Sequence, residues 1–162
     1  MWKATTGLNK PNETGNFLPV NGQWKMMKLP IKASTAIEEG SALAIEIATN
    51  TTTGYITKMG TENALGSDFV GILAEPITAT DSDYATAGKL KWVRVPTSIY
   101  SEAYFTVWAG TFTSVDVFKT VEIHSDAKSL AVDTAGKGAR ITGYIDSTHG
   151  KCVFSLPATE TA

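Results

Sequence analysis

The chain has 162 residues, of which 43% are hydrophobic and 19% are charged, and its 14 basic and 16 acidic residues give a formal net charge of -2. This length predicts one domain with a substantial core. The charge balance argues against nucleic acid as the main partner, because neutralising phosphates requires clustered lysine and arginine, and no apolar run approaches the ~20 residues that span a bilayer, which argues against a membrane partner.

Residues 1–28 differ in composition from the rest of the chain. They are rich in Asn, Gly, Pro and Thr, and their large apolar residues follow no period of 2 or 3.6, so we expect an extended arm. The candidate partner-binding residues of this arm are Trp2, Leu8, Phe17, Leu18, Val20 and Trp24. Two uses stay open: the arm binds another protein or a sister copy, or it wraps its own domain. The first six residues lack the apolar segment of a secretory signal, so we expect synthesis in a cytoplasm.

From residue 29 onward, short runs alternate between apolar and polar side chains. The runs cover residues 29–33, 43–47, 55–59, 69–73, 90–95, 103–107, 115–123, 130–132, 141–145 and 152–156. Alternation of period 2 indicates strands with one buried face, and turn residues between the runs are typical of a sandwich or barrel. We therefore expect an all-β fold: a single small β-barrel or sandwich of short antiparallel strands over residues 29–158, with a flexible tail at 159–162.

Two of these runs place a glycine between apolar residues. Gly71 lies in residues 69–73 and Gly143 in residues 141–145. A glycine inside a strand marks a bulge, a bend or the close approach of another backbone. Two shorter β-like runs precede each glycine-bearing run, so the sequence predicts a loose internal repeat. Two such units packed together would form a barrel without long free edges.

Side chains that could carry chemistry are few. His149 and Cys152 supply only two of the three or four ligands that a zinc site needs. Asp146, His149 and Cys152 have the side-chain types of a nucleophilic triad, but alternation places Cys152 on one face with Phe154 and Leu156, where burial makes a thiol inert. We therefore expect no enzyme, no metal and no cofactor, and a small enzyme with a cryptic site stays as an alternative.

Alternation turns several aromatic residues outward. Trp92, Tyr104 and Trp108 are candidate partner-binding residues of the body, because aromatic side chains are enriched in protein interfaces. The alternative is that both faces of these strands are covered. Three basic residues lie close to Trp92 in the sequence: Lys89, Lys91 and Arg94. Three charges in an acidic chain favour a solvated strand over a nucleic-acid-binding face.

Three runs, at residues 37–45, 69–76 and 141–145, resemble the small β-barrel head-decoration (capsid cement) proteins of tailed bacteriophages. In that family such runs open the domain and return as strands with a glycine between two Ile or Val residues. The resemblance covers most of the body and none of the arm. It implies a structural virion protein on the capsid exterior, made in the host cytoplasm, that bridges neighbouring major capsid protein subunits and contacts sister copies of itself.

Other functions stay open at this point. A carbohydrate- or receptor-binding β module of a phage fibre would use exposed Trp92, Tyr104 or Trp108 as platforms for sugar rings. A subunit of a tail or tube would assemble with itself.

Overall fold

The computed structural model describes residues 16–48, 51–59, 69–136 and 138–154. Within these ranges the regular structure consists of strands and one short 3₁₀ turn, η2 (Ser114–Asp116), which confirms the all-β fold class. The strands are β1 (Leu18–Asn21), β2 (Trp24–Ile31), β3 (Ala42–Ala48), β4 (Thr51–Lys58), β5 (Phe69–Leu73), β6 (Lys89–Pro96), β7 (Glu102–Ala109), β8 (Thr120–Ile123), β9 (Ser129–Ala135), β10 (Ala139–Asp146) and β11 (His149–Phe154).

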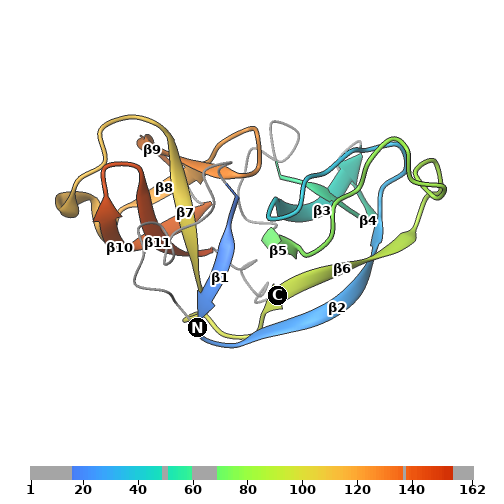
Figure 1. Cartoon of the computed structure of the whole chain (residues 1–162), viewed down its shortest axis with the longest axis horizontal. Coiled ribbons are helices and arrows are strands. Elements are labelled where there is room, and N and C mark those ends of the chain that lie inside the picture. The colour runs from blue at the N-terminus through green and yellow to red at the C-terminus, as the bar shows by residue number, and fades with distance from the viewer. Residues whose placement is uncertain (1–15, 49–50, 60–68, 137, 155–162) are drawn as a thin grey trace.

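The strands form two closed rings that lie side by side (Figure 1). The first ring is a barrel with the order β2-β4-β3-β5-β6. The other sheet has the order β1-β7-β11-β10-β8-β9, and it also closes, because β9 pairs with β7. β1 is an additional strand on the edge of β7. The barrel-type architecture was expected, and the structure refines it to two five-stranded barrels in one body.

The two barrels have the same topology, which confirms the predicted repeat. In each barrel the first strand pairs antiparallel with the fifth (β2 with β6, β7 with β11) and parallel with the third (β2 with β4, β7 with β9). The second strand pairs with the third and the fourth, and the fourth pairs with the fifth, all antiparallel. β2 to β6 therefore correspond in order to β7 to β11.

Backbone hydrogen bonds extend this correspondence to single residues. The Gly40 N–H donates to the Leu73 carbonyl, and the Leu73 N–H donates to the carbonyl of the residue after Gly40. In the second barrel the Phe118 N–H donates to the Ile141 carbonyl, and the Ile141 N–H donates to the carbonyl of the residue after Phe118. Gly40 thus corresponds to Phe118, and Leu73 to Ile141.

The two glycines that suggested the repeat lie at different positions in it. Counting back two residues from Leu73 and from its counterpart, Gly71 corresponds to Ala139, so Gly71 and Gly143 are not equivalent. Gly71 admits a neighbouring strand, because a Cβ there would lie 2.6 Å from the Arg94 carbonyl oxygen. Gly143 lies at a bulge, because the register of β10 against β11 shifts between Ile141 and Gly143. The predicted physical role of these glycines is correct, but their alignment with each other is wrong.

A continuous apolar core holds the barrels together. The first barrel is filled by Ile31, Ile37, Leu43, Ile56, Leu73, Ile77 and Val93. A larger cluster fills the second barrel and extends into the seam between the two. At the seam Phe69 of β5 stacks on Phe154 of β11 with ring centroids 3.9 Å apart, and Phe17 meets the same Phe154 ring edge-on at 5.0 Å. Because aromatic rings from both barrels share one buried cluster, the chain is a single folded unit.

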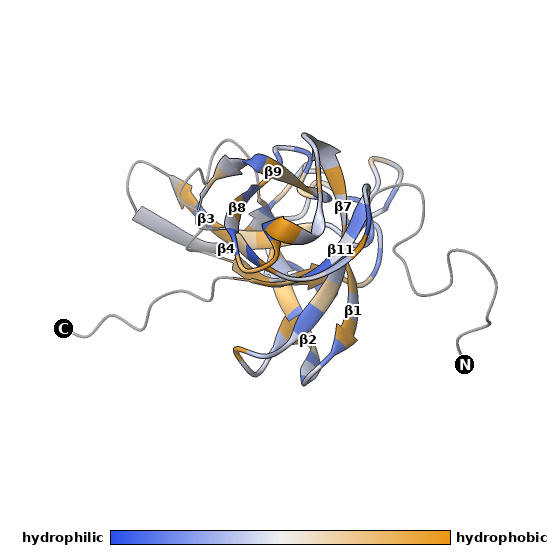
Figure 2. Cartoon of the chain, turned by 90° about the vertical axis from the view of Figure 1, so that its left-hand side faces the viewer, coloured by the Kyte–Doolittle hydropathy of each residue, from blue (hydrophilic) through white to orange (hydrophobic). Residues whose placement is uncertain are grey.

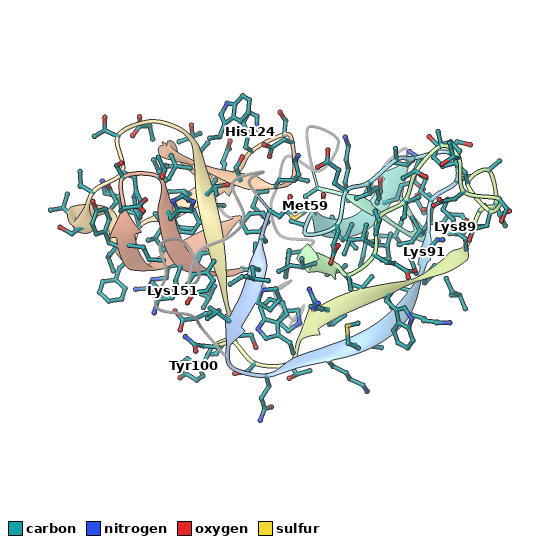
Figure 3. The ribbon with its side chains drawn as sticks, in the orientation of Figure 1. Met59, Lys89, Lys91, Tyr100, His124 and Lys151 are labelled. Carbon is teal, nitrogen blue, oxygen red and sulfur yellow. The ribbon has the colours of Figure 1, made fainter. Side chains whose placement is uncertain are left out.

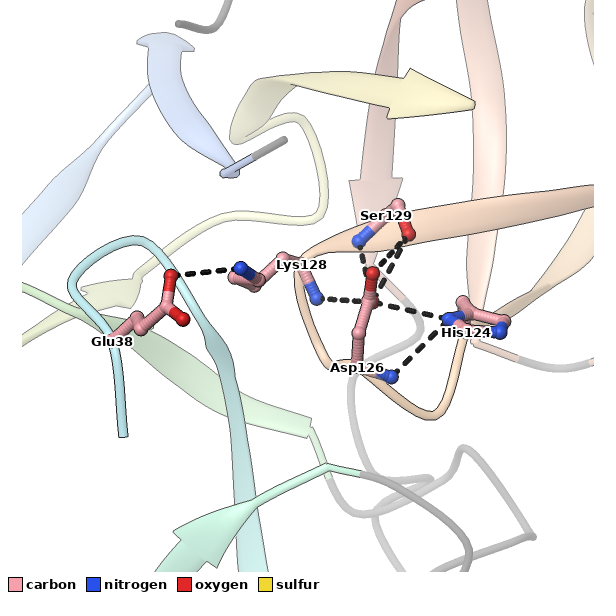
Figure 4. A network of polar contacts seen from close by, with 5 residues as sticks. All are labelled: Glu38, His124, Asp126, Lys128 and Ser129. Carbon is pink, nitrogen blue, oxygen red and sulfur yellow. Dashed lines mark hydrogen bonds and ion pairs between the residues drawn. The ribbon is translucent and has the colours of Figure 1, made fainter. Parts of the chain in front are cut away.

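Polar contacts also link the two barrels (Figure 4). The Asp126 carboxylate accepts hydrogen bonds from the N–H of Lys128 and from the N–H and hydroxyl of Ser129, which fixes the loop between β8 and β9. The Lys128 ammonium then lies 2.7 Å from the Glu38 carboxylate of the first barrel. Since Glu38 is largely exposed, this ion pair contributes little stability, and we assign it an orienting role.

The expected arm over residues 1–28 is wrong for its second half. Phe17 is buried at the seam, β1 pairs with β7, and β2 pairs with β6 along its whole length. The sequence pattern failed because residues 25–28 of β2 are all exposed, which hides the alternation of a strand. Residues 1–15 of the arm and the tail at 159–162 lie outside the described residues.

We predict that the two barrels unfold together. Replacing Phe154 with Ala removes the ring that Phe17 and Phe69 contact, so we expect the free energy of unfolding to fall by about 3–5 kcal/mol. Val153→Ala, a smaller change at a half-buried neighbour, should cost less than about 1.5 kcal/mol. Urea denaturation gives both values, and amide exchange should show equal loss of protection in the two barrels. Separate transitions for the two barrels would contradict the shared core.

A second prediction concerns the start of the fold. A chain that begins at residue 16 keeps β1, β2 and Phe17, so we expect its far-UV circular dichroism to retain the β-sheet spectrum and its thermal unfolding to stay cooperative. A chain that begins at residue 29 loses β1 and most of β2 and should fail to fold, because the first barrel can no longer close. A cooperatively folded chain from residue 29 would contradict this boundary.

Candidate binding surfaces

Four of the six predicted arm residues lie in the described part of the chain: Phe17, Leu18, Val20 and Trp24. Phe17 is buried in the seam, so its predicted contact with a partner is wrong. Leu18 and Val20 are half-buried in β1. Trp24 begins β2 and packs against the larger core cluster, and its indole N–H donates to the Asn21 carbonyl at 3.1 Å. Trp2 and Leu8 lie outside the described residues.

The three predicted aromatic residues of the body differ in exposure. Trp92 is 40% exposed and Trp108 is 59% exposed, so both remain candidates. Tyr104 is buried, and this burial, with the charge of Glu102, raises the pKa of its phenol. Its prediction as a binding residue is wrong, because β1 and β11 flank Tyr104 on both sides. Since β1 was not recognised as a strand, this cover was not visible in the sequence.

Exposed apolar residues gather on the ribbon formed by β2 and β6, where directly opposed residues point to the same face. We call one side of this ribbon the ribbon face. It consists of three opposed pairs: Pro30 with Leu90, Lys28 with Trp92, and Met26 with Arg94. Leu90 is 58% exposed and Met26 is 49% exposed, and the Lys28 ammonium lies 5.1 Å from the centroid of the Trp92 ring. Figure 2 shows that hydrophilic and hydrophobic residues are mixed along β2.

This ribbon is also strongly basic. β2 and β6 contain five basic residues and no acidic residue: Lys25, Lys28, Lys89, Lys91 and Arg94. Subtracting these five positive charges from the net charge of -2 leaves -7 on the rest of the chain. In the sequence only the basic residues near Trp92 stand out, because Lys25 and Lys28 fall within the predicted arm.

Two of the five basic residues are engaged (Figure 3). The buried Lys89 ammonium donates to the carbonyls of Tyr84 at 2.8 Å and Lys32 at 3.0 Å, and burial lowers the pKa of Lys89. The Lys91 ammonium lies 3.1 Å from the Asp83 carboxylate. The other three have no ion pair with any described residue. The ribbon therefore combines exposed apolar side chains with uncompensated positive charge.

Trp108 forms a second, separate surface at the end of β7. Its ring stacks on the His124 imidazole with centroids 4.0 Å apart and an angle of 15° between the planes. One face of the indole is thus covered by His124, while most of the side chain stays exposed. A flat, exposed and supported ring of this kind can stack on another flat or apolar surface.

Phe118 is an exposed aromatic residue on strained backbone. Its φ is +76°, in the left-handed region that favours glycine, and Gly40 at the corresponding position of the first barrel has φ +81°. Phe118 is 66% exposed, and the Arg140 guanidinium lies 5.4 Å from its ring centroid. The repeat shows that glycine suits this position, so the large side chain has a cost that its local contacts only partly offset.

The candidate catalytic residues do not converge. His149 Nδ1 lies 3.0 Å from the Asp146 carboxylate, within the turn between β10 and β11. Cys152 lies three residues further along β11, so it points to the opposite face, into the core, where burial raises the pKa of its thiol. Within the described ranges, no three His, Cys, Asp or Glu residues are grouped so as to hold a metal ion. No helix in this part of the chain is long and apolar enough to cross a membrane.

Comparison with known proteins gives no relative to guide the interpretation. No protein family, no curated protein and no solved structure matches this chain.

We predict that Phe118→Gly does not destabilise the protein. The substitution relieves the left-handed strain and loses a mostly exposed ring, so we expect the melting temperature to stay the same or to rise. Phe118→Ala loses the same ring but keeps the strain, and it should be less stable than the glycine variant by about 1 kcal/mol. Thermal and urea unfolding of the two variants measure this difference. A glycine variant that is less stable than the alanine variant would contradict the assignment of strain.

Proposed function

We propose that this chain is a structural virion protein that binds the outer surface of a phage capsid and bridges neighbouring major capsid protein subunits. The observation that supports this proposal most directly is the ribbon face. Protein interfaces are enriched in aromatic residues, Met and Arg, and this face presents Trp92, Met26 and Arg94 from two adjacent strands. The resemblance of the sequence to head-decoration proteins is the reason for proposing the major capsid protein as the partner of this surface.

The architecture suits a protein whose function is to form an interface with other proteins. Two closed barrels with a shared core present surfaces on rigid strands, which lowers the entropy lost on binding. On a lattice of identical subunits, many weak contacts act together through effective concentration. In this proposal the arm is limited to residues 1–15, with Trp2 and Leu8 as its apolar contacts to the capsid or to a sister copy. It joins the body at Phe17, which the seam holds in place.

A second candidate function is favoured by one specific observation. Trp108 is exposed and supported by His124, which is the arrangement of a stacking platform for a sugar ring. A carbohydrate- or receptor-binding module would bind its ligand through this residue, whereas the decoration protein would bind its shell through the ribbon face.

A pair of matched variants separates the two functions. The shells are assembled from the major capsid protein encoded in the same genome, and occupancy is measured by co-sedimentation and imaging. We expect wild-type protein and Trp108→Ala to decorate shells equally, and Trp92→Ala to bind about tenfold more weakly, because an exposed anchor ring is lost. Failure of the wild-type protein to bind these shells would refute the proposal. Glycan-array binding that Trp108→Ala abolishes would establish the second function instead.

A further inference from the structure

Among the described residues, no strand lies beside one edge of β2 over most of its length. β6 covers the other edge from Trp24 to Ile31, whereas β4 meets this edge only where Ile31 lies opposite Ile56. No other backbone group of the described chain bonds to residues 25–28. These four residues are all exposed, and we call this stretch of β2 the open edge.

The second barrel shows what such an edge accommodates. In the first barrel Met27 lies opposite Val93, and in the second barrel Ala103 lies opposite Cys152. These two pairs are equivalent, because Val93 also lies opposite Leu73, Cys152 also lies opposite Ile141, and Leu73 corresponds to Ile141. At Ala103 the corresponding edge of β7 is filled, because β1 pairs with it antiparallel and places Pro19 opposite Ala103. One copy of the repeat thus has a strand on this edge, and the other copy has none there within the part of the chain that the structure describes.

The charge of the open edge defines which strand it accepts. Lys25 and Lys28 lie on it, and Arg94 lies beside it on β6, opposite Met26. None of these three cations has an ion pair with a described residue. Two copies of this edge would repel each other, as lysines on edge strands generally prevent self-pairing. A strand that carries Asp or Glu would instead have its charges compensated.

We propose that the open edge takes up an extended acidic segment of a partner protein as an added antiparallel strand. The orientation follows that of β1 on β7. Main-chain hydrogen bonds along the edge supply affinity, and the alternating side chains supply specificity. Acidic side chains of the segment meet Lys25 and Lys28, and apolar ones meet Met26 and Met27. This inference rests on the proposed function, in which the partner is the major capsid protein.

A protein partner fits this edge better than nucleic acid. A nucleic acid is a long polyanion, and the charge of -7 outside β2 and β6 repels it beyond the ribbon. A protein segment contacts only the edge itself. The exposed Met26 and Met27 also match apolar side chains, which a sugar–phosphate backbone lacks.

The test compares three full-length proteins on the shells described above. The edge variant carries Lys25→Glu and Lys28→Glu. The control variant carries Lys58→Glu and Arg140→Glu, two exposed positions on other strands, so both variants change the net charge by the same amount. We expect the edge variant to bind shells at least about tenfold more weakly, the control variant to bind like wild type, and amide exchange at residues 25–28 to slow when wild-type protein is bound.

The outcomes distinguish failure of this inference from failure of the proposed function. If wild-type protein binds shells while the edge variant binds equally well, or residues 25–28 gain no protection, the inference is overturned and the function stands. If wild-type protein binds no shell, the proposed function fails, and a synthetic peptide decides the inference. An eight-residue peptide with the pattern Glu-Val-Val-Glu repeated twice places Glu opposite both Lys25 and Lys28 and should protect residues 25–28, while the same peptide with Lys in place of Glu should not.

Three further results would overturn the inference in that peptide experiment. The first is equal binding of the acidic and basic peptides, or binding of neither. The second is protection of residues 25–28 by single-stranded DNA but not by the acidic peptide, which would assign the edge to nucleic acid. The third is protection of these residues on self-association of the free protein, detected by sedimentation, which would assign the edge to a second copy.

Discussion

The structure depends on the closure of two rings of backbone hydrogen bonds. In each barrel the first strand pairs with both the third and the fifth, so five short strands leave few unpaired peptide groups. None of these strands exceeds eight residues, and a single hairpin of this length is at best marginally stable in water. Closure therefore makes each half of the chain a structural unit. The aromatic seam around Phe154 then makes the two halves one protein.

The sequence predicted those parts of the fold that local patterns determine. Alternation predicted most strands of the body, and their repeated order was predicted from the two glycine-bearing runs, which are β5 and β10; the structure confirms this order. The run at residues 115–123 was predicted too long, because residues 114–116 form η2 and the strand there, β8, begins at Thr120. β2 was not predictable in this way, because the middle of the strand extends past the barrel and exposes both of its faces. A strand with two wet faces has no period-2 pattern, and only its pairing with β6 identifies it.

The candidate surfaces show the same limit. Exposure of Trp92 and Trp108 follows from alternation within their own strands. Burial of Tyr104 does not, since its cover comes from β1 and β11, which are distant in the sequence. The ribbon face joins residues of β2 to residues of β6 that lie at least sixty positions later, so its apolar and basic character exists only after folding. The ribbon face forms only because β2 pairs with β6, and local sequence patterns do not show which strands pair.

The two copies of the repeat differ in structure at two equivalent positions. Gly40 adopts the left-handed backbone of its position without strain, whereas Phe118 at the equivalent position is strained and exposes its ring. The edge of β7 is filled by β1, whereas no strand of the described residues fills the corresponding edge of β2. A shared fold alone would give equivalent positions equivalent surroundings. Lysines on the open edge disfavour pairing with a second copy, and in the proposal above its main-chain groups, which no described strand pairs, bind a segment of opposite charge.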